Sequence, residues 1–272
     1  MQSFLKFNEK TMKTKLKVIF ATLTVALLFI SVSKAKPSVQ EESFNVSSGG
    51  TLAMDSDSGS IEIESHNKNT VEVTVKKKGK YIDDFEVSFA QDGNDVKVTG
   101  DKLKNNFNWG GSSYIKYIVK IPQQYNVDLR TGGGSIELSD LVGKVDAYTS
   151  GGSISLGRIS GDVEVKTSGG SIKVDDVAGN INAHTSGGSI KAKISKQPTQ
   201  DCRLTTSGGS VKAYLSPSIA VDLNASTSGG SVSSEIAVKG SMKRSRIKGT
   251  INGGGPELYL RTSGGSVSVK EL

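Results

Sequence analysis

From residue 131 onward, apolar and polar residues alternate in short segments that recur along the chain. Each segment follows a phrase of the TSGGSI type, and the copies begin at Thr131, Thr149, Thr167, Thr185, Thr206, Thr227 and Thr262. The fifth residue after each threonine is β-branched: Ile136, Ile154, Ile172, Ile190, Val211, Val232 and Val267. A polar residue comes next, and in most copies a second apolar residue follows it. This alternation predicts a short strand with one buried face.

The second half of each 18-residue copy predicts another such strand. In the first three complete copies, equivalent positions hold Leu141, Ile159 and Val177, then Gly143, Gly161 and Gly179, then Val145, Val163 and Ile181. Each copy is therefore expected to contain two strands and two bends marked by glycine. In the last and longest gap, Asn252–Gly255 is interpreted as a degenerate copy of the phrase.

Equal spacing of equal residue types indicates that the copies stack, with like residues about 4.8 Å apart in adjacent coils. One coil buries too few side chains to be stable alone, so the array must fold as one body. Because parallel crossovers are normally right-handed, the sequence predicts an all-β protein, a right-handed parallel β-solenoid (β-helix) of ~18–21-residue coils. The coil can be two-sided or three-sided. The alternative fold is an antiparallel meander, in which the glycine bends are hairpin turns.

Residues 36–130 are expected to form an irregular N-terminal β region that caps the solenoid of residues 131–272. Alternation predicts strands at Thr70–Lys76, Phe85–Phe89, Asp95–Val98 and Tyr114–Ile121. The polar segment Lys102–Ser113, which carries Trp109, is predicted to be a loop. A cap of this kind shields the open edge of the first coil.

The first 35 residues resemble a cleaved secretory signal peptide. An uncharged run at Val18–Val32 follows several lysines, and Ser33-Lys34-Ala35 offers small residues at a cleavage site. The run is short for a membrane span, which needs about 20 residues. A retained anchor is the alternative, and Met12 is an alternative start.

Removal of this segment changes the charge of the chain. The net charge of +7 includes six lysines and one glutamate within residues 1–35, so the remainder carries only +2. That balance gives no reason to expect a nucleic-acid partner. Cys202 is the only cysteine, which excludes an internal disulfide and predicts an inert, partly buried thiol.

Several phrases resemble a bacterial family of exported domains, DUF4097, whose members are described as "putative adhesin". The phrases are YIVKIP at Tyr117–Pro122, NVDLRTGGGSIEL at Asn126–Leu138, GKVDAYTSGGSISL at Gly143–Leu156 and GGGPELYLRTSGGSVSV at Gly253–Val269. The resemblance implies an exported or envelope-associated β-solenoid, named an adhesin largely by analogy, and it brings no catalytic residues. Some members are implicated in envelope-stress responses, which implies a second kind of role.

The repeated phrase does not fit known phosphate or calcium sites. A P-loop needs a lysine that SGGSI lacks, and it joins a strand to a helix. Calcium-binding rolls place an aspartate in every coil. Here Asp140 is the nearest candidate, and the equivalent positions of the next copies hold Arg158, Asp176 and Ile194. No cofactor or metal is therefore expected.

Catalysis is also not expected. β-Helix enzymes that act on polysaccharides use clustered carboxylates, and the polar column Asp146, Glu164 and Asn182 offers only two. His66 and His184, the only histidines, lie far apart in the sequence and have no evident triad partners.

Binding is the remaining chemistry. The outward column after each phrase contains Lys173, Lys191 and Lys212, a candidate basic stripe for an anionic glycan or lipid headgroup, although a merely solvated face has the same composition. Tyr148 and Tyr214 could stack on sugars or simply pack.

The sequence thus predicts a non-enzymatic exported or cell-envelope β-solenoid with an adhesin-like or scaffold role. The expected location is periplasmic, cell-surface or extracellular, and the chain is not expected to be an integral membrane protein once the signal is removed. Its expected partner is an envelope glycan, lipid or protein. The alternatives are an envelope-stress sensor that binds a peptide or lipid, and a glycan-active β-helix enzyme.

Overall fold

The computed structural model describes residues 38–79, 82–103 and 114–272. The predicted signal peptide (1–35) and Trp109, with most of the predicted loop around it, lie outside the described residues. Contacts group Pro37–Leu272 into one compact unit. The boundary expected between residues 130 and 131 stays a prediction.

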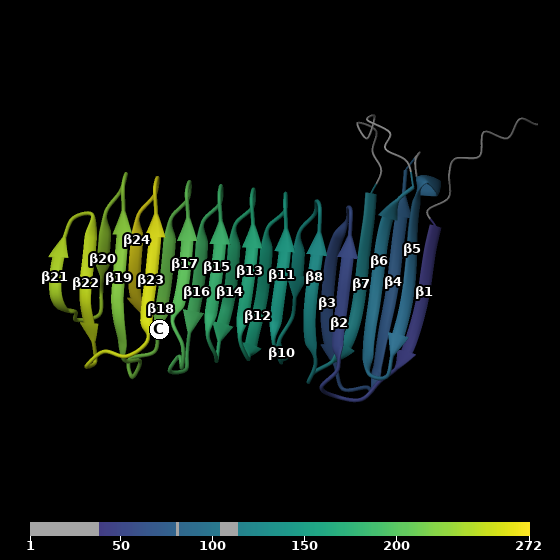
Figure 1. The fold of residues 1–272 in the computed structure, drawn as a ribbon, viewed down its shortest axis with the longest axis horizontal. Helices are drawn as coiled ribbons and strands as arrows, with labels where there is room; N and C mark the ends of the chain where they lie inside the picture. The colour runs from purple at the N-terminus through teal and green to yellow at the C-terminus, as the bar shows by residue number, and fades with distance from the viewer. Residues whose placement is uncertain (1–37, 80–81, 104–113) are drawn as a thin grey trace, which may run out of the picture. The chain divides into compact units, whose positions relative to one another are not determined.

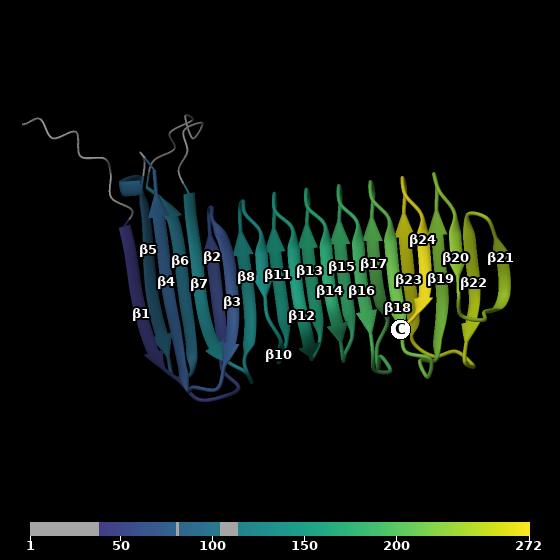
Figure 2. The same cartoon turned by 180° about the vertical axis from the view of Figure 1, so that it is seen from behind.

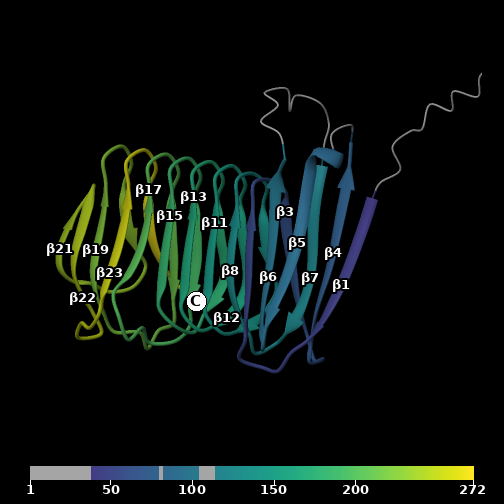
Figure 3. The same cartoon turned by 45° about the vertical axis from the view of Figure 1, so that its right-hand side comes forward.

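Two twelve-stranded sheets face each other across one continuous apolar core (Figure 1, Figure 3). In spatial order, sheet A contains β1 (Ser38–Asn45), β4 (Thr70–Lys78), β7 (Tyr114–Pro122), β3 (Ser60–His66), β9 (Ile136–Leu138), β12 (Ile154–Ser160), β14 (Ile172–Val177), β16 (Ile190–Ile194), β18 (Val211–Leu215), β24 (Val267–Glu271) and β20 (Val232–Ser234), with β10 (Leu141–Val142) beside β12. Sheet B contains β21 (Lys239–Lys243), β22 (Arg246–Ile251), β19 (Val221–Thr227), β23 (Glu257–Thr262), β17 (Cys202–Thr206), β15 (Ile181–Thr185), β13 (Val163–Thr167), β11 (Val145–Thr149), β8 (Asn126–Thr131), β2 (Thr51–Ser56), β6 (Asp95–Lys102) and β5 (Phe85–Asp92). The described residues contain no α-helix and a single 3₁₀ turn, η1 (Ile82–Asp84).

Each coil places one strand in each sheet, so the coil is two-sided. Strands of successive copies pair in parallel and in register, with Ile154 opposite both Ile136 and Ile172. Ile172 in turn lies opposite Ile190, and all four isoleucines are at most 1% exposed. The parallel pairing confirms the β-solenoid and excludes the antiparallel meander for the repeat.

The TSGGSI phrase forms the bend between the sheets. The buried Thr149 hydroxyl donates to the Gly134 carbonyl of the preceding coil at 2.8 Å and accepts the Gly152 N–H at 3.3 Å. A Cβ at Gly152 would lie 2.0 Å from the Gly134 oxygen, so only glycine allows this approach of adjacent coils. The phrase is therefore architecture: threonine, glycine and serine join each bend to its neighbour.

The order of coils along the stack differs from chain order at both ends. The last coil, β23–β24, lies between β17–β18 and β19–β20, as the yellow strands in Figures 1 and 2 show. The bends agree, because Thr262 donates to the Gly209 carbonyl and Thr227 donates to the Gly265 carbonyl. At the other end, β2–β3 lies between β6–β7 and β8–β9. Stacking in chain order therefore fails between the Thr206 and Thr227 copies, because the last copy lies between them.

Antiparallel strands close both ends of the stack. At the C-terminal end, β22 runs antiparallel to β19, and β21 runs antiparallel to β22. Asn252 (φ 50°) begins the turn after β22, so Asn252–Gly255 is not the degenerate copy that its glycines indicated. At the N-terminal end, the predicted strands are present as β4, β5, β6 and β7, with β1 outermost in sheet A.

Candidate functional site

The three lysines of the predicted stripe form one row on the outward face of sheet A. Lys191 in β16 lies directly opposite Lys173 in β14 on one side and Lys212 in β18 on the other. Buried core residues flank each lysine along its strand, which turns all three side chains outward. We call these three residues the lysine row.

The members of the lysine row differ in their neighbours. Lys173 pairs with Asp175 at 2.9 Å on its own strand. The Lys191 ammonium lies 5.3 Å from the centroid of the Tyr214 ring. Within the described part of the chain, Lys212 forms no ion pair. Directly opposed like charges destabilise a sheet. The repulsion between the three lysines therefore lowers the stability of sheet A, and Asp175 and the Tyr214 ring offset this loss only in part.

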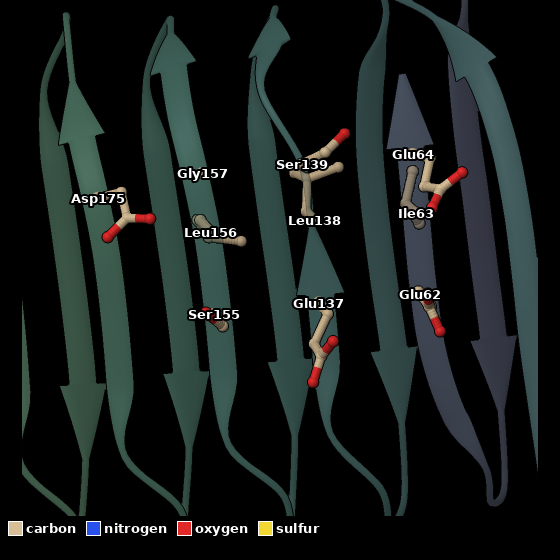
Figure 4. Close-up of a pocket in the computed structure, with 10 residues that line it drawn as sticks. All are labelled: Glu62, Ile63, Glu64, Glu137, Leu138, Ser139, Ser155, Leu156, Gly157 and Asp175. Carbon is tan, nitrogen blue, oxygen red and sulfur yellow. The ribbon is translucent and has the colours of Figure 1, made fainter. Parts of the chain in front are cut away.

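The same row becomes acidic toward the N-terminal end. Glu62 lies opposite Glu137, and Ser155 separates Glu137 from Lys173. These acidic residues border a shallow depression of about 280 Å³, which Glu64 and Asp175 also line (Figure 4). Gly157 also lines the depression, and a Cβ there would lie 2.6 Å from Asp140 Oδ1. Sheet A therefore presents an acidic depression next to the lysine row.

Neighbouring cations partly neutralise this depression. Glu62 pairs with Lys116, and Asp175 is the partner of Lys173. Among the described residues, no three histidine, cysteine, aspartate or glutamate side chains are placed to hold a metal ion.

Asp140, the calcium candidate, is bound by an arginine. It accepts the Arg158 backbone N–H and Nε, each at 2.8 Å, and these bonds hold the pKa of its carboxyl below the ordinary value. Asp176 lies opposite Arg158, as the spacing of the copies predicts. Ile194, however, lies opposite Val177, because the register shifts at an irregularity in β14. The equivalence of these positions, expected from the spacing of the copies, therefore fails at Ile194.

The carboxylates considered for hydrolysis lie on the outward face of sheet B. Asp146 lies opposite both Asp128 and Glu164, and Glu164 lies opposite Asn182. Partial burial, together with the charges of Asp128 and Glu164, raises the pKa of Asp146. Asp128 and Glu164 each have a cation two residues along the strand, at 3.2 Å for Arg130 and 2.6 Å for Lys166. The column therefore contains one more carboxylate than the sequence analysis counted.

The two histidines lie on different sheets. His66 Nε2 hydrogen-bonds with the Thr70 carbonyl beside sheet A, and His184 Nδ1 with the Thr205 hydroxyl on sheet B. The structure does not bring them together. His184 lies opposite Lys166, two residues along β15 from Asn182.

The remaining candidates divide between surface and core. Tyr148 is 38% exposed on sheet B, and Tyr214 lies beside Lys191 on sheet A. Cys202 is 1% exposed, more buried than the sequence indicated, and burial raises the pKa of its thiol.

The sequence analysis missed a group of arginines on sheet B. Arg261 lies between Arg203 and Arg246 only because β23 inserts between β17 and β19. One signal was visible, since Lys239, Lys243, Arg244, Arg246 and Lys248 lie within ten residues that contain no acidic residue.

Comparison with known proteins identifies the family. The model described as Toastrack DUF4097 matches residues 50–178 and 159–270. Comparison with curated proteins gives no match. Within the described residues, no helix is long and apolar enough to cross a membrane.

Several solved structures are similar to this chain. One is described as a "putative cell adhesion protein" from Clostridium sporogenes ATCC 15579, with 14% identity, a TM-score of 0.39, and 87% of this chain and 100% of that chain covered. A "putative adhesin" from Bacteroides fragilis NCTC 9343 has 13% identity, a TM-score of 0.38, and coverage of 86% and 97%. A "Putative lipid binding protein" from Parabacteroides distasonis ATCC 8503 has 14% identity, a TM-score of 0.26, and coverage of 86% and 96%. The family match spans well over half of the sequence and coincides with the stacked coils, so this protein belongs to the Toastrack DUF4097 family.

Proposed function

We propose that this protein is a non-enzymatic, exported or cell-envelope β-solenoid with an adhesin-like or scaffold role, and that its lysine row binds an anionic group of the envelope. The observation that carries the proposal is the row itself: three outward lysines on adjacent strands of a rigid sheet. Strands in a sheet are about 4.8 Å apart, so these charges repel one another. An anionic partner would remove that repulsion on binding.

The absence of catalysis is part of the proposal. Hydrolysis of a glycan needs one protonated and one ionised carboxyl beside the scissile bond. Asp146 has a raised pKa, but its two neighbours are paired with Arg130 and Lys166 on an outward sheet face. This pairing favours a structural role for the column.

Export is proposed from the sequence of residues 1–35, with its lysines, uncharged run and small residues before the expected cleavage site. Fractionation of the producing cells, with detection of the mature chain, tests this part.

Replacement of the lysine row tests the binding role. The variant K173Q/K191Q/K212Q should lose most of its binding to the purified envelope fraction of the producing cells, measured by co-sedimentation. A matched control, K76Q/K97Q/K120Q, removes three exposed lysines near the N-terminal end and should bind as the unmodified protein does.

Equal binding by both variants would rule out the lysine row as the binding surface. Turnover of an envelope glycan by the unmodified protein, abolished by Asp146→Asn, would instead show an enzyme. Thermal unfolding of each variant, measured by circular dichroism, confirms that the fold is intact.

A further inference from the structure

A cluster of arginines lies on the opposite sheet from the lysine row, where the last coil enters the stack. Arg203 comes from β17, Arg261 from the inserted β23, and Arg246 from the antiparallel β22. Each has a buried neighbour along its strand, and the alternation of the strand turns each side chain outward from sheet B. We call these three residues the arginine cluster.

The strand register arranges the cations in two rows that cross the strands. In the first row, Arg261 lies opposite Ser226, Ser226 opposite Arg246, and Arg246 opposite Lys243. The second row runs beside it and contains Arg203, Tyr259, Asn224 and Lys248. The first row therefore places three cations on four adjacent strands, separated only by a serine.

The first row crosses a depression of about 320 Å³. Its polar lining includes Ser226, Ser228, Ser245, Arg246, Tyr259 and Arg261. None of the described residues that line it is acidic. Guanidinium and hydroxyl groups donate hydrogen bonds, so the depression is built to receive a group that accepts them.

Tyr259 holds two of the arginines in place. The Arg203 guanidinium lies 4.4 Å from the centroid of the Tyr259 ring, and Arg261 Nη1 lies 3.5 Å from the Tyr259 hydroxyl. Neither contact supplies a counter-charge, so both guanidinium groups keep their positive charge exposed.

The nearest acidic side chains lie outside the depression. Glu257 lies opposite Asp222 in the next row of sheet B, beyond the second row of cations. Glu257 accepts a hydrogen bond from the Asn224 amide at 2.9 Å, and Asp201 accepts the Glu257 backbone N–H at 2.8 Å. Among the described residues, none of these three carboxylates lines the depression or forms an ion pair with the arginine cluster.

We propose that this part of sheet B binds a linear anionic polysaccharide, whose sulfate, phosphate or carboxylate groups occupy the depression between Arg261 and Arg246. Arginine pairs with such groups through two parallel hydrogen bonds. Two strand spacings separate Arg261 from Arg246, about 10 Å, and Lys243 lies one strand further. A row of charges at such intervals fits a chain of regularly spaced anions. The site is separate from the lysine row and does not depend on it.

The exposed side chains at the C-terminal end of the stack favour a polysaccharide over a membrane. Met242 is 57% exposed, but it lies opposite Ile247, whose side chain is buried. Residues directly opposite each other share a face, so Met242 points away from the arginine cluster. No large aliphatic side chain of the described residues is exposed beside the cluster for insertion into lipid.

Binding of dextran sulfate, with neutral dextran of the same length as the reference, tests the proposal by isothermal titration calorimetry. The unmodified protein should bind dextran sulfate and not dextran. R246Q/R261Q should weaken binding at least tenfold, whereas K97Q/K120Q, which removes the same charge elsewhere, should change it less than twofold. R246K/R261K should give an intermediate loss, because lysine keeps the charge but cannot form the paired hydrogen bonds.

Three outcomes would overturn the proposal. The first is equal affinity of R246Q/R261Q and K97Q/K120Q for dextran sulfate, with thermal unfolding unchanged in both. The second is full recovery of affinity in R246K/R261K, which would indicate attraction to charge alone. The third is sedimentation with phosphatidylglycerol vesicles that depends on the two arginines while dextran sulfate does not bind, which would assign the site to a membrane.

Discussion

The middle coils and the C-terminal coils are built from the same phrase, but they stack by different rules. From Val145 to Leu215, each coil lies on the coil that precedes it in the chain. At the C-terminal end, the last coil separates two coils that are neighbours in sequence. The phrase thus specifies how two coils join, through the threonine and glycine contacts of each bend, without specifying which two coils join. The difference has consequences for function, since the arginine cluster exists only where chain order is broken.

A charge in the core should have its largest effect in the middle of the stack. Ile172 is 1% exposed and has a coil on each side, so Ile172→Asp buries a carboxylate without a partner and should cost more than about 4 kcal/mol. The whole array should lose protection from hydrogen exchange.

The same change at the end of sheet A provides the control. Val232 lies in β20, the last strand of that sheet, so Val232→Asp should unfold only the strands at the C-terminal end of the stack. Protection retained throughout the far coils in Ile172→Asp would show that the stack is not one cooperative body.

Engineered disulfides test the inserted coil directly. Thr205 lies opposite Arg261 in the structure, whereas sequential stacking would place it opposite Ser226. T205C/R261C should therefore cross-link readily and stabilise the protein by about 2–4 kcal/mol, the usual range for a disulfide. T205C/S226C should not cross-link, because the two strands are separated by β23. Mass spectrometry under non-reducing conditions distinguishes the two pairs. A cross-link in T205C/S226C but not in T205C/R261C would show that the coils stack in chain order.

Two glycines in neighbouring bends, Gly133 and Gly152, should differ sharply in their tolerance of a side chain. A Cβ at Gly152 would lie 2.0 Å from the Gly134 oxygen, whereas a Cβ at Gly133 would meet nothing within 4 Å. Gly152→Ala should cost about 1–3 kcal/mol, the range for overpacking, and Gly133→Ala should stay within about 0.5 kcal/mol. Urea unfolding measures both. Equal losses of stability in the two variants would mean that close contact between coils is not the reason for the glycine in the phrase.

The sequence predicted the parts of the fold that depend on local repetition. Recurrence of isoleucine and threonine was enough to place Ile136, Ile154 and Ile172 in one buried column and Lys173, Lys191 and Lys212 in one outward row. It could not predict the position of Thr262, because Thr206 and Thr227 offer bends with the same chemistry. The arginine cluster was hidden for the same reason: its members become neighbours through long-range pairing that no local pattern records.

The smallest expected effect on stability comes from the side chains that lie opposite one another on adjacent strands of sheet B. In the middle of sheet B, Asp146 lies between two like charges, whereas in the C-terminal coils Tyr259 and Asn224 separate Arg203 from Lys248. The raised pKa of Asp146 means that the folded state favours its protonated form. Stability from this residue is therefore present at low pH and is lost as the pH rises from the ordinary value of 3.8 through the raised one. Asp146→Asn should stabilise the protein by about 0.5 kcal/mol at pH 7, and the gain should vanish near pH 3. Urea unfolding at the two pH values measures the difference, and a gain that is independent of pH would show that Asp146 is not strained by its neighbours.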